Sequence, residues 1–201
     1  MDLFSQDLSQ NLLPKDGTLI DFGCIYSKAE CKVLFDKLLK ECNWQQDEVI
    51  IFGKKHITAR KTAWYGTKSF AYSYSKTTRF AEAFANTVLD IKRDVENHLK
   101  ESFNSCLLNL YHDGNEGMGF HSDDEKELVK HGSIASLSFG TTRKFVFKHK
   151  KEKLKRELFL QPGQLIVMKN EIQDYWKHGI PKSKKIVSPR INLTFRNIIE
   201  A

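Results

Sequence analysis

From residue 106 onward, apolar and polar side chains alternate with a period of two, which is the pattern of half-buried β-strands. Turn-forming residues interrupt this pattern at Asp113-Gly114, Gly140 and Pro162-Gly163. The alternation predicts strands over residues 106–111, 133–139, 143–149, 157–160, 164–168 and 190–196. Because many short strands favour two packed sheets, we expect a sandwich or a jelly roll here. The alternation alone does not separate the two.

Helical periodicity dominates the chain up to about residue 103. Ser27-Lys28-Ala29-Glu30 is a capping box, which predicts the start of a helix with a buried stripe formed by Val33, Leu34, Leu38 and Leu39. A second helix is predicted over residues 79–100, where apolar residues recur every three or four positions: Phe80, Phe84, Val88, Ile91, Val95 and Leu99. Between the helices we expect short strands and hairpins. The expected fold is therefore α+β, in one domain spanning residues 1–201.

The composition restricts the class of protein without naming it. With 40% apolar and 28% charged residues, a chain of 201 residues can form a folded core. A net charge of +7 favours a polyanionic partner. The four cysteines have no metal-ligand spacing, so reduced thiols are expected. No apolar run approaches ~18 residues and the N-terminus lacks a signal-peptide pattern. We therefore expect a soluble monomer without a membrane partner, cytoplasmic or, in a eukaryote, nuclear.

One carboxylate and two imidazoles form a candidate metal site, in His121-Ser122-Asp123 and His178. On extended backbone, side chains two residues apart point the same way, so His121 and Asp123 can bind one ion. Such a facial set covers three corners of an octahedral ferrous ion and leaves three for co-substrate and dioxygen. A His-x-Asp motif is common by chance, and a single histidine is more often a surface residue than a ligand. His98, in the second predicted helix, and His149, in a basic run, are left out.

The strand predicted over residues 190–196 has two unlike faces. Its apolar face would pack against an outer layer, whereas the other face carries Arg190, Asn192, Thr194 and Arg196. Burying two guanidinium groups is costly without anionic partners, and a dicarboxylate ligand would supply them. Asn109 and Tyr111 share one face of an earlier strand in the same way. Taken in isolation, a half-exposed edge strand with solvated arginines explains residues 190–196 equally well.

Together these segments resemble the AlkB-type Fe(II)/2-oxoglutarate dioxygenases, which remove alkyl groups from nucleic-acid bases. The matching stretches are 109–111, 121–125, 136–140, 145–149 and 189–196. The resemblance implies a double-stranded β-helix, or jelly roll, as a catalytic core in residues 104–201, with helical support and a substrate-binding lid in residues 1–103. It implies that His121, Asp123 and His178 bind Fe(II), with O2 as a co-substrate. It implies that 2-oxoglutarate is bound by Asn109, Tyr111, Arg190, Thr194 and Arg196.

The same resemblance implies three sets of substrate contacts. Asp124 would contact the damaged base, where a carboxylate favours cationic lesions over neutral bases. Phe52, Gly53 and Lys54 would form a hairpin tip that wedges into the base stack and contacts phosphate. Tyr72, Ser73 and Tyr74 would form the lid over the flipped base. A solvated acidic turn over residues 123–127 and a core strand that ends at Gly53 are the plainer interpretations.

The implied function is oxidative demethylation of N-alkylated bases in DNA, of the 1-methyladenine and 3-methylcytosine type. Decarboxylation of 2-oxoglutarate would be coupled to hydroxylation of the methyl carbon and release of formaldehyde. The basic segments 148–156 and 182–185 suit backbone phosphates, although a charge run is usually a solvated hairpin. The alternatives are the same chemistry on RNA, a protein or a small molecule, and a catalytically silent nucleic-acid-binding module.

Overall fold

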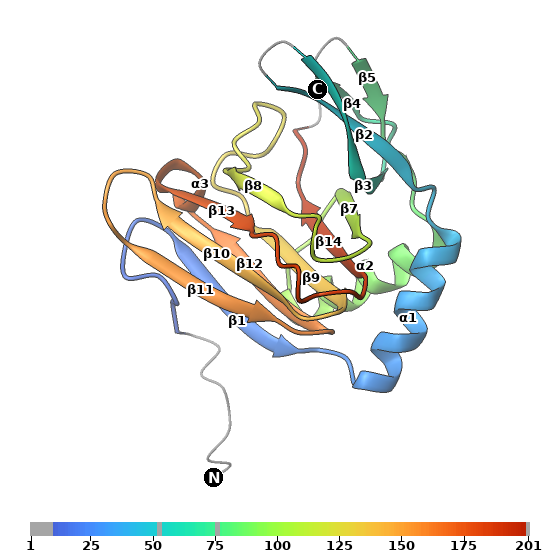
Figure 1. Cartoon of the computed structure of the whole chain (residues 1–201), viewed down its shortest axis with the longest axis horizontal. Coiled ribbons are helices and arrows are strands. Elements are labelled where there is room, and N and C mark those ends of the chain that lie inside the picture. Colours follow the sequence, from blue (N-terminus) through green and yellow to red (C-terminus); the bar gives the residue numbers. More distant parts are fainter. Residues whose placement is uncertain (1–9, 52–53, 75–76, 200–201) are drawn as a thin grey trace.

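Two β-sheets that face each other form the framework of the chain, as Figure 1 shows. The computed structural model describes residues 10–51, 54–74 and 77–199. The eight-stranded sheet runs in the order β1 (Thr18–Cys24), β12 (Gln164–Lys169), β9 (Ile134–Gly140), β14 (Arg190–Arg196), β7 (Ser105–Tyr111), β3 (Lys54–Gly66) and β2 (Gln45–Ile51), with β6 (Glu82–Ala83) beside β3. The four-stranded sheet runs in the order β11 (Lys155–Leu160), β10 (Arg143–His149), β13 (Trp176–Ile180) and β8 (Met118–His121).

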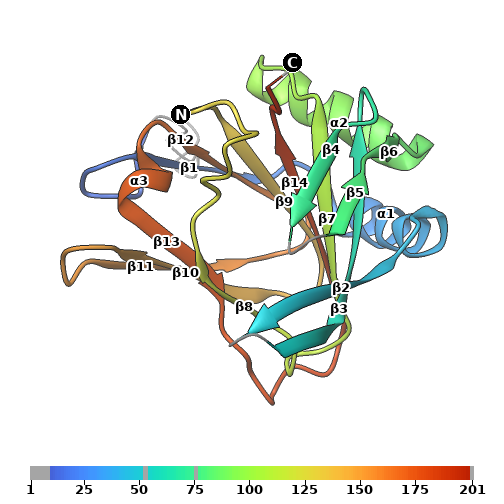
Figure 2. The same cartoon turned by 90° about the horizontal axis from the view of Figure 1, so that it is seen from above.

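Within the described residues, three helices and a hairpin complete the fold. The helices are α1 (Lys28–Glu41), α2 (Asn86–Leu99) and the short α3 (Ile172–Tyr175), and the hairpin joins β4 (Ala71–Tyr74) to β5 (Thr77–Phe80). Figures 1 and 2 show α1 and α2 on the side of the larger sheet that faces away from the smaller one. No helix in the described part of the chain is both long enough and apolar enough to span a membrane.

The apolar core lies in two layers. The outer layer joins the helices to the back of the larger sheet, and it includes Leu38, Ile91, Leu108, Leu193 and Phe195. The inner layer fills part of the space between the sheets, with residues such as Tyr111, Phe145, Phe147, Met168 and Trp176. This arrangement confirms the expected jelly roll with helical support. The space left between the sheets is where polar side chains meet, and it holds the candidate site.

The two helices follow the sequence prediction only in part. Ser27 caps α1 as predicted, since its Oγ accepts a hydrogen bond from the Glu30 N–H at 3.3 Å and its N–H donates to Glu30 Oε2 at 2.8 Å. Val33 and Leu39, placed on the buried stripe, are exposed. Val33 lies five residues before the buried Leu38. At about 3.6 residues per turn, the two side chains point to different sides of the helix. Cys31 and Leu38, seven residues apart, form the buried line instead.

The second helix begins at Asn86, not at residue 79. Residues 79–80 end β5, which pairs with β4, and Glu82–Ala83 pair in parallel with β3. Phe80 is 60% exposed, so its helical spacing from Phe84 does not reflect a buried helix face. Backbone pairing with neighbouring strands has therefore overridden the local helical period. Val88, Ile91 and Val95 are buried as predicted.

The strands predicted from residue 106 onward agree with the structure to within one or two residues. The strands β1, β6, β8 and β13 lie where no strand was predicted. The strands β1, β2 and β3 come from the first section of the chain and form the two flanks of the larger sheet. All four cysteines are free, as expected, and only Cys24 is exposed.

Candidate metal centre and co-substrate pocket

The pairing of β8 with β13 brings the two candidate histidine ligands together. His121 and His178 are direct partners in the antiparallel register, and their ring centroids lie 4.5 Å apart. Asp123 follows two residues after His121, with its Oδ1 3.6 Å from His121 Nε2 and its Oδ2 3.9 Å from His178 Nε2. One ligand atom from each residue lies within 4.8 Å of the others. The sequence-predicted triad is therefore assembled around a point where one ion can be bound.

Neighbouring groups fix the orientation of each candidate ligand. His121 Nδ1 donates to the Gly119 carbonyl at 2.9 Å, which leaves the Nε2 lone pair for a metal. The Asp123 N–H donates to Gln173 Oε1 at 2.9 Å. The His178 ring packs beside the Phe145 and Phe147 rings, with centroid distances of 5.4 and 5.8 Å. The site is thus held in shape by the protein itself.

The charge states of the triad suit a divalent cation. Asp123 is 5% exposed, and burial alone would raise its pKa, but the Arg196 guanidinium and the two imidazoles outweigh burial and hold the pKa below its usual range. Burial lowers the pKa of His178 to about 4, so this imidazole is neutral at pH 7. Burial also acts to lower the pKa of His121, but the adjacent Asp123 raises it overall. A carboxylate and a neutral imidazole are the forms that metals bind.

A buried arginine forms the floor of the pocket. Arg190 is 1% exposed, and its Nη2 donates to Ser138 Oγ at 2.9 Å and to Asn192 Oδ1 at 2.8 Å. Its Nε and Nη1 are buried without a hydrogen-bond partner. Burial lowers the pKa of Arg190 to about 10, so the group stays charged at neutral pH. A buried cation with unpaired donors fits a carboxylate of a ligand. The solvated edge-strand interpretation is wrong, because β14 is central in its sheet.

The other predicted co-substrate residues lie on the same inner face as Arg190. Tyr111 is the register partner of Arg190, and its ring centroid lies 5.7 Å from the guanidinium carbon. Asn109, opposite Asn192 in the register, has a buried Oδ1 without a partner. Thr194 Oγ1 accepts from Asn192 Nδ2 at 2.9 Å. Asn109, Tyr111 and Thr194 therefore line the same pocket as the Arg190 guanidinium.

Arg196 connects the floor of the pocket to the metal centre. Its Nη2 donates to Asp123 Oδ1 at 2.9 Å, and its Nε is buried without a partner. Asn192, Ser136 and Ser138 complete the polar network, with Ser136 Oγ donating to Asn192 Oδ1 at 3.0 Å. The sequence analysis placed Asn192 on the polar face but did not assign it to the site. Ser136 and Ser138 could have been found from their two-residue spacing in a strand that precedes a turn.

The structure shows the side chains of only some of the residues expected to contact substrate. Asp124 is exposed, whereas Glu125 has a buried carboxylate oxygen without a hydrogen-bond partner. Burial raises the pKa of Glu125, Arg196 counteracts the increase, and Asp123 adds to it, so this acidic group lies close to the metal centre. Asp124 was the predicted contact, and Glu125 was not singled out from the sequence. A buried acid beside the triad is a second candidate for contact with a cationic ligand.

The structure describes the segments of the predicted wedge and lid only in part. Phe52 and Gly53 lie outside the described residues, while Ile51 of β2 pairs with Lys54 of β3, which are the flanking arms of a hairpin. Tyr72, Ser73 and Tyr74 lie in β4, paired with β5. Their side chains, and that of Lys54, are outside those described. The expected hairpins therefore exist, and the contacts of their side chains stay predictions.

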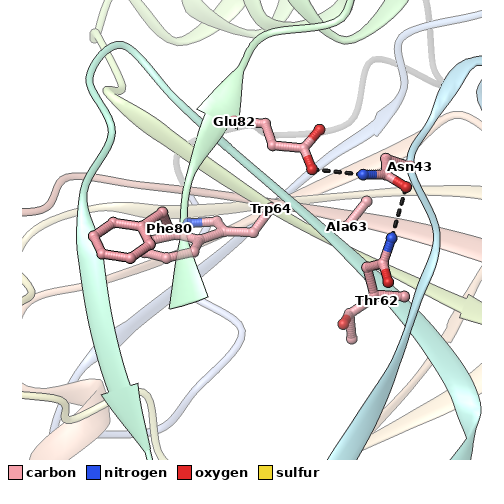
Figure 3. Close-up of a pocket in the computed structure, with 7 residues that line it drawn as sticks. Asn43, Thr62, Ala63, Trp64, Phe80 and Glu82 are labelled. Carbon is pink, nitrogen blue, oxygen red and sulfur yellow. Dashed lines mark hydrogen bonds between the residues drawn. The ribbon is translucent and has the colours of Figure 1, made fainter. Parts of the chain in front are cut away.

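A polar cavity of about 270 Å³ opens where β2 and β6 share one edge of β3, as Figure 3 shows. Gln45 pairs with Thr62 and Glu82 pairs with Tyr65, so the intervening Ala63 and Trp64 line the gap between the two strands. The polar groups bond one another, with Asn43 Nδ2 donating to Glu82 Oε1 at 2.7 Å. This cavity contains no residue of the triad or of the arginine floor. Its lining is therefore a satisfied polar cluster at the sheet edge.

A second group of potential ligands lies at Asp16, His149 and Glu152. His149 Nε2 lies 3.1 Å from Asp16 Oδ2, and His149 Nδ1 accepts from the Glu152 N–H at 3.0 Å. Both ring nitrogens are thus engaged within the protein, and Lys15 neutralises the two acids through ion pairs. The cluster joins the N-terminal segment to the end of β10. Excluding His149 from the metal site is consistent with this geometry.

Comparison with known proteins adds to these observations. Residues 20–196 match the family described as the 2OG-Fe(II) oxygenase superfamily. The chain is 34% identical over 206 residues to the DNA oxidative demethylase ALKBH2 of Bos taurus, covering 97% of this chain and 74% of that protein. It is 35% identical over 181 residues to the alpha-ketoglutarate-dependent dioxygenase alkB homolog 3 of Bos taurus, covering 84% of this chain and 62% of that one. The solved structure of OsALKBH1 matches with a TM-score of 0.58 at 15% identity, over 92% of this chain and 98% of the other, which supports the fold.

Proposed function

Because this chain belongs to the AlkB-type dioxygenases of the 2OG-Fe(II) oxygenase superfamily, we propose that it oxidatively demethylates N-alkylated bases in DNA. The observation that carries the proposal is the juxtaposition of the His121, Asp123 and His178 triad with a buried arginine that has two unpaired donors. Similarity to the DNA oxidative demethylase ALKBH2 supplies the substrate class.

We assign three roles to the side chains of the site. His121, Asp123 and His178 would bind Fe(II) through two imidazole nitrogens and one carboxylate oxygen. Arg190 would bind the distal carboxylate of 2-oxoglutarate, with Asn109, Tyr111 and Thr194 lining the same pocket. Arg196 would hold Asp123 and stabilise negative charge near the metal.

When bound, Fe(II) and 2-oxoglutarate supply from O2 an oxidant that hydroxylates a methyl carbon, with succinate and CO2 as co-products. The protein positions the co-substrate and excludes water from the site. The buried arginine floor would hold the co-substrate in one orientation, and the Phe145 and Phe147 rings pack against His178. After hydroxylation, the N–CH2–OH group breaks its C–N bond, the hydroxyl proton is lost, and formaldehyde leaves with the base restored.

We infer that the acidic side of the site selects the lesion. 1-Methyladenine and 3-methylcytosine carry a positive charge that normal bases lack, and Asp124 and Glu125 would place negative charge beside the target ring. Phe52, Gly53 and Lys54 would open the stack of a duplex, and Tyr72, Ser73 and Tyr74 would cover the flipped base. We further propose that residues 1–103 supply the lid and support for a core in residues 104–201. The protein would work as a monomer in the cytoplasm or nucleus, with RNA as an additional substrate.

Mass spectrometry on methylated oligonucleotides tests the proposal. The protein, loaded with Fe(II), is incubated with single-stranded DNA that contains 1-methyladenine or 3-methylcytosine, with and without 2-oxoglutarate. We expect a loss of about 14 mass units only in the presence of 2-oxoglutarate. Matched RNA oligonucleotides measure the tolerance for RNA. Turnover of RNA with no change in any methylated DNA would contradict the assignment of DNA as the substrate.

A further inference from the structure

The two faces of strand β8 lie in different environments. Phe120 directly precedes His121, so the two side chains point to opposite sides of the smaller sheet. His121 turns towards the metal centre, whereas Phe120 is 41% exposed on the outer side. β8 is an edge strand, and its Met118 Sδ lies 3.2 Å from Arg60 Nη1 on β3. A large apolar ring therefore lies at the surface, one residue from a candidate metal ligand.

A row of lysines crosses the same outer face. Lys148 of β10 is the register partner of Lys155 on β11 and of Lys177 on β13, and all three are exposed. Like charges placed directly opposite each other on one face destabilise a sheet. The Lys148 ammonium lies 4.1 Å from the centroid of the Phe120 ring, which is a cation–π contact. The row thus leads from the β10–β11 hairpin to the edge strand that carries His121.

The positive charge on this face is concentrated near the metal centre. At the far end, Glu157 forms ion pairs with both Lys144 and Lys155, and the Lys144 ammonium lies 5.3 Å from the Phe159 ring centroid. Among the described residues, no carboxylate lies within ion-pair distance of Lys148 or Lys177. One aromatic–lysine pair is therefore neutralised by the protein, and the other is left for an external anion.

We propose that Phe120, Lys148 and Lys177 bind the nucleotides that flank the target base. The Phe120 ring would stack on a neighbouring base, and the two ammonium groups would contact backbone phosphates. Aromatic rings beside a cationic track are the usual means of binding single strands without regard to sequence. This inference rests on the proposed function, since it gives the substrate strand a path next to the metal centre.

Fluorescence anisotropy with a labelled, unmodified single-stranded DNA tests this surface at several salt concentrations. Phe120→Ala should weaken binding by about five-fold to about a hundred-fold, which corresponds to the loss of one base–aromatic stack. Phe120→Trp should restore most of the affinity. The double variant Lys148→Ala and Lys177→Ala should reduce the slope of log K against log salt by about 1.4, because two phosphate contacts are lost.

Phe159→Ala and Lys144→Ala are matched controls from the neutralised end of the same face, and they should bind like the parent protein. Equal losses for Phe120→Ala and Phe159→Ala would overturn the proposal, as would a lack of rescue by tryptophan or a parent protein that does not bind the strand. Thermal unfolding shows whether each variant is folded. Binding is measured on unmodified DNA, so the two proposals can fail separately. If Phe120→Ala weakens binding and Phe159→Ala does not, but no demethylation is observed, only the proposed chemistry is contradicted. Normal demethylation without that effect would contradict the surface alone.

Discussion

The arginine floor leads to a quantitative prediction about co-substrate binding. Arg190→Met replaces the guanidinium with an uncharged side chain of similar length. The Nε and Nη1 of that guanidinium lack partners within the protein. If Nε and Nη1 each donate one charge-assisted bond to the bound ligand, and each bond contributes about 1.5 kcal/mol, the variant loses about 3 kcal/mol of binding free energy. That corresponds to a KM for 2-oxoglutarate raised by about a hundred-fold. Arg190→Lys keeps the charge without the paired donors, so a smaller increase is expected.

The assay is succinate production, measured with 2-oxoglutarate varied at saturating DNA and then with DNA varied at saturating 2-oxoglutarate. The KM for 2-oxoglutarate should rise far more than the KM for DNA. Thermal unfolding of the protein without ligands is the control for folding. A guanidinium buried without an anion is costly, so Arg190→Met should unfold at a temperature close to that of the parent. Equal rises in both KM values, or a rise in the KM for DNA alone, would refute the assigned role of Arg190.

Three other predictions concern the metal centre and the hairpin. His178→Ala should abolish turnover while circular dichroism shows a folded protein, and retained turnover would remove His178 as a ligand. Phe52→Ala should reduce activity on duplex DNA more than on single strands, because only the duplex requires a stacked neighbour to be displaced; equal losses would favour a plain core strand. Because the pKa of His178 is lowered to about 4, the unfolded chain binds its proton between about pH 6.5 and pH 4 and the folded protein does not. The metal-free protein should therefore lose about 3 kcal/mol more stability than His178→Gln as the pH falls through this window, and equal losses in denaturant unfolding would contradict burial as the cause.

The sequence predicted strands of the jelly roll because these depend on local periodicity. On β14, alternation placed Arg190 and Arg196 on one face, and the neighbouring strands then buried that face. The same local reasoning failed at residue 79, where pairing between strands distant from the helix decides the backbone conformation. The short strands β8 and β13 were missed because four or five residues give too little alternation to detect.

The site residues that were missed are those whose role depends on tertiary contacts. Glu125 has no periodic signal, and only burial beside Arg196 distinguishes it from the other acids of its turn. Gln173 lies in α3 and contacts the backbone of Asp123 from 50 positions away, which no local pattern reveals. The predicted ligands themselves were found because their residue types restrict the chemistry.

The placement of both histidine ligands on paired strands has a consequence for dynamics. β8 is four residues long and has one hydrogen-bonded neighbour in its sheet, with His121 facing His178 across that pairing. Short edge strands open locally at a lower free energy than the centre of a sheet. An ion coordinated by both histidines would link β8 to β13, so dissociation of the metal and fraying of this edge would be one coupled equilibrium. Slower amide exchange in β8 on addition of a divalent cation would be its direct signature.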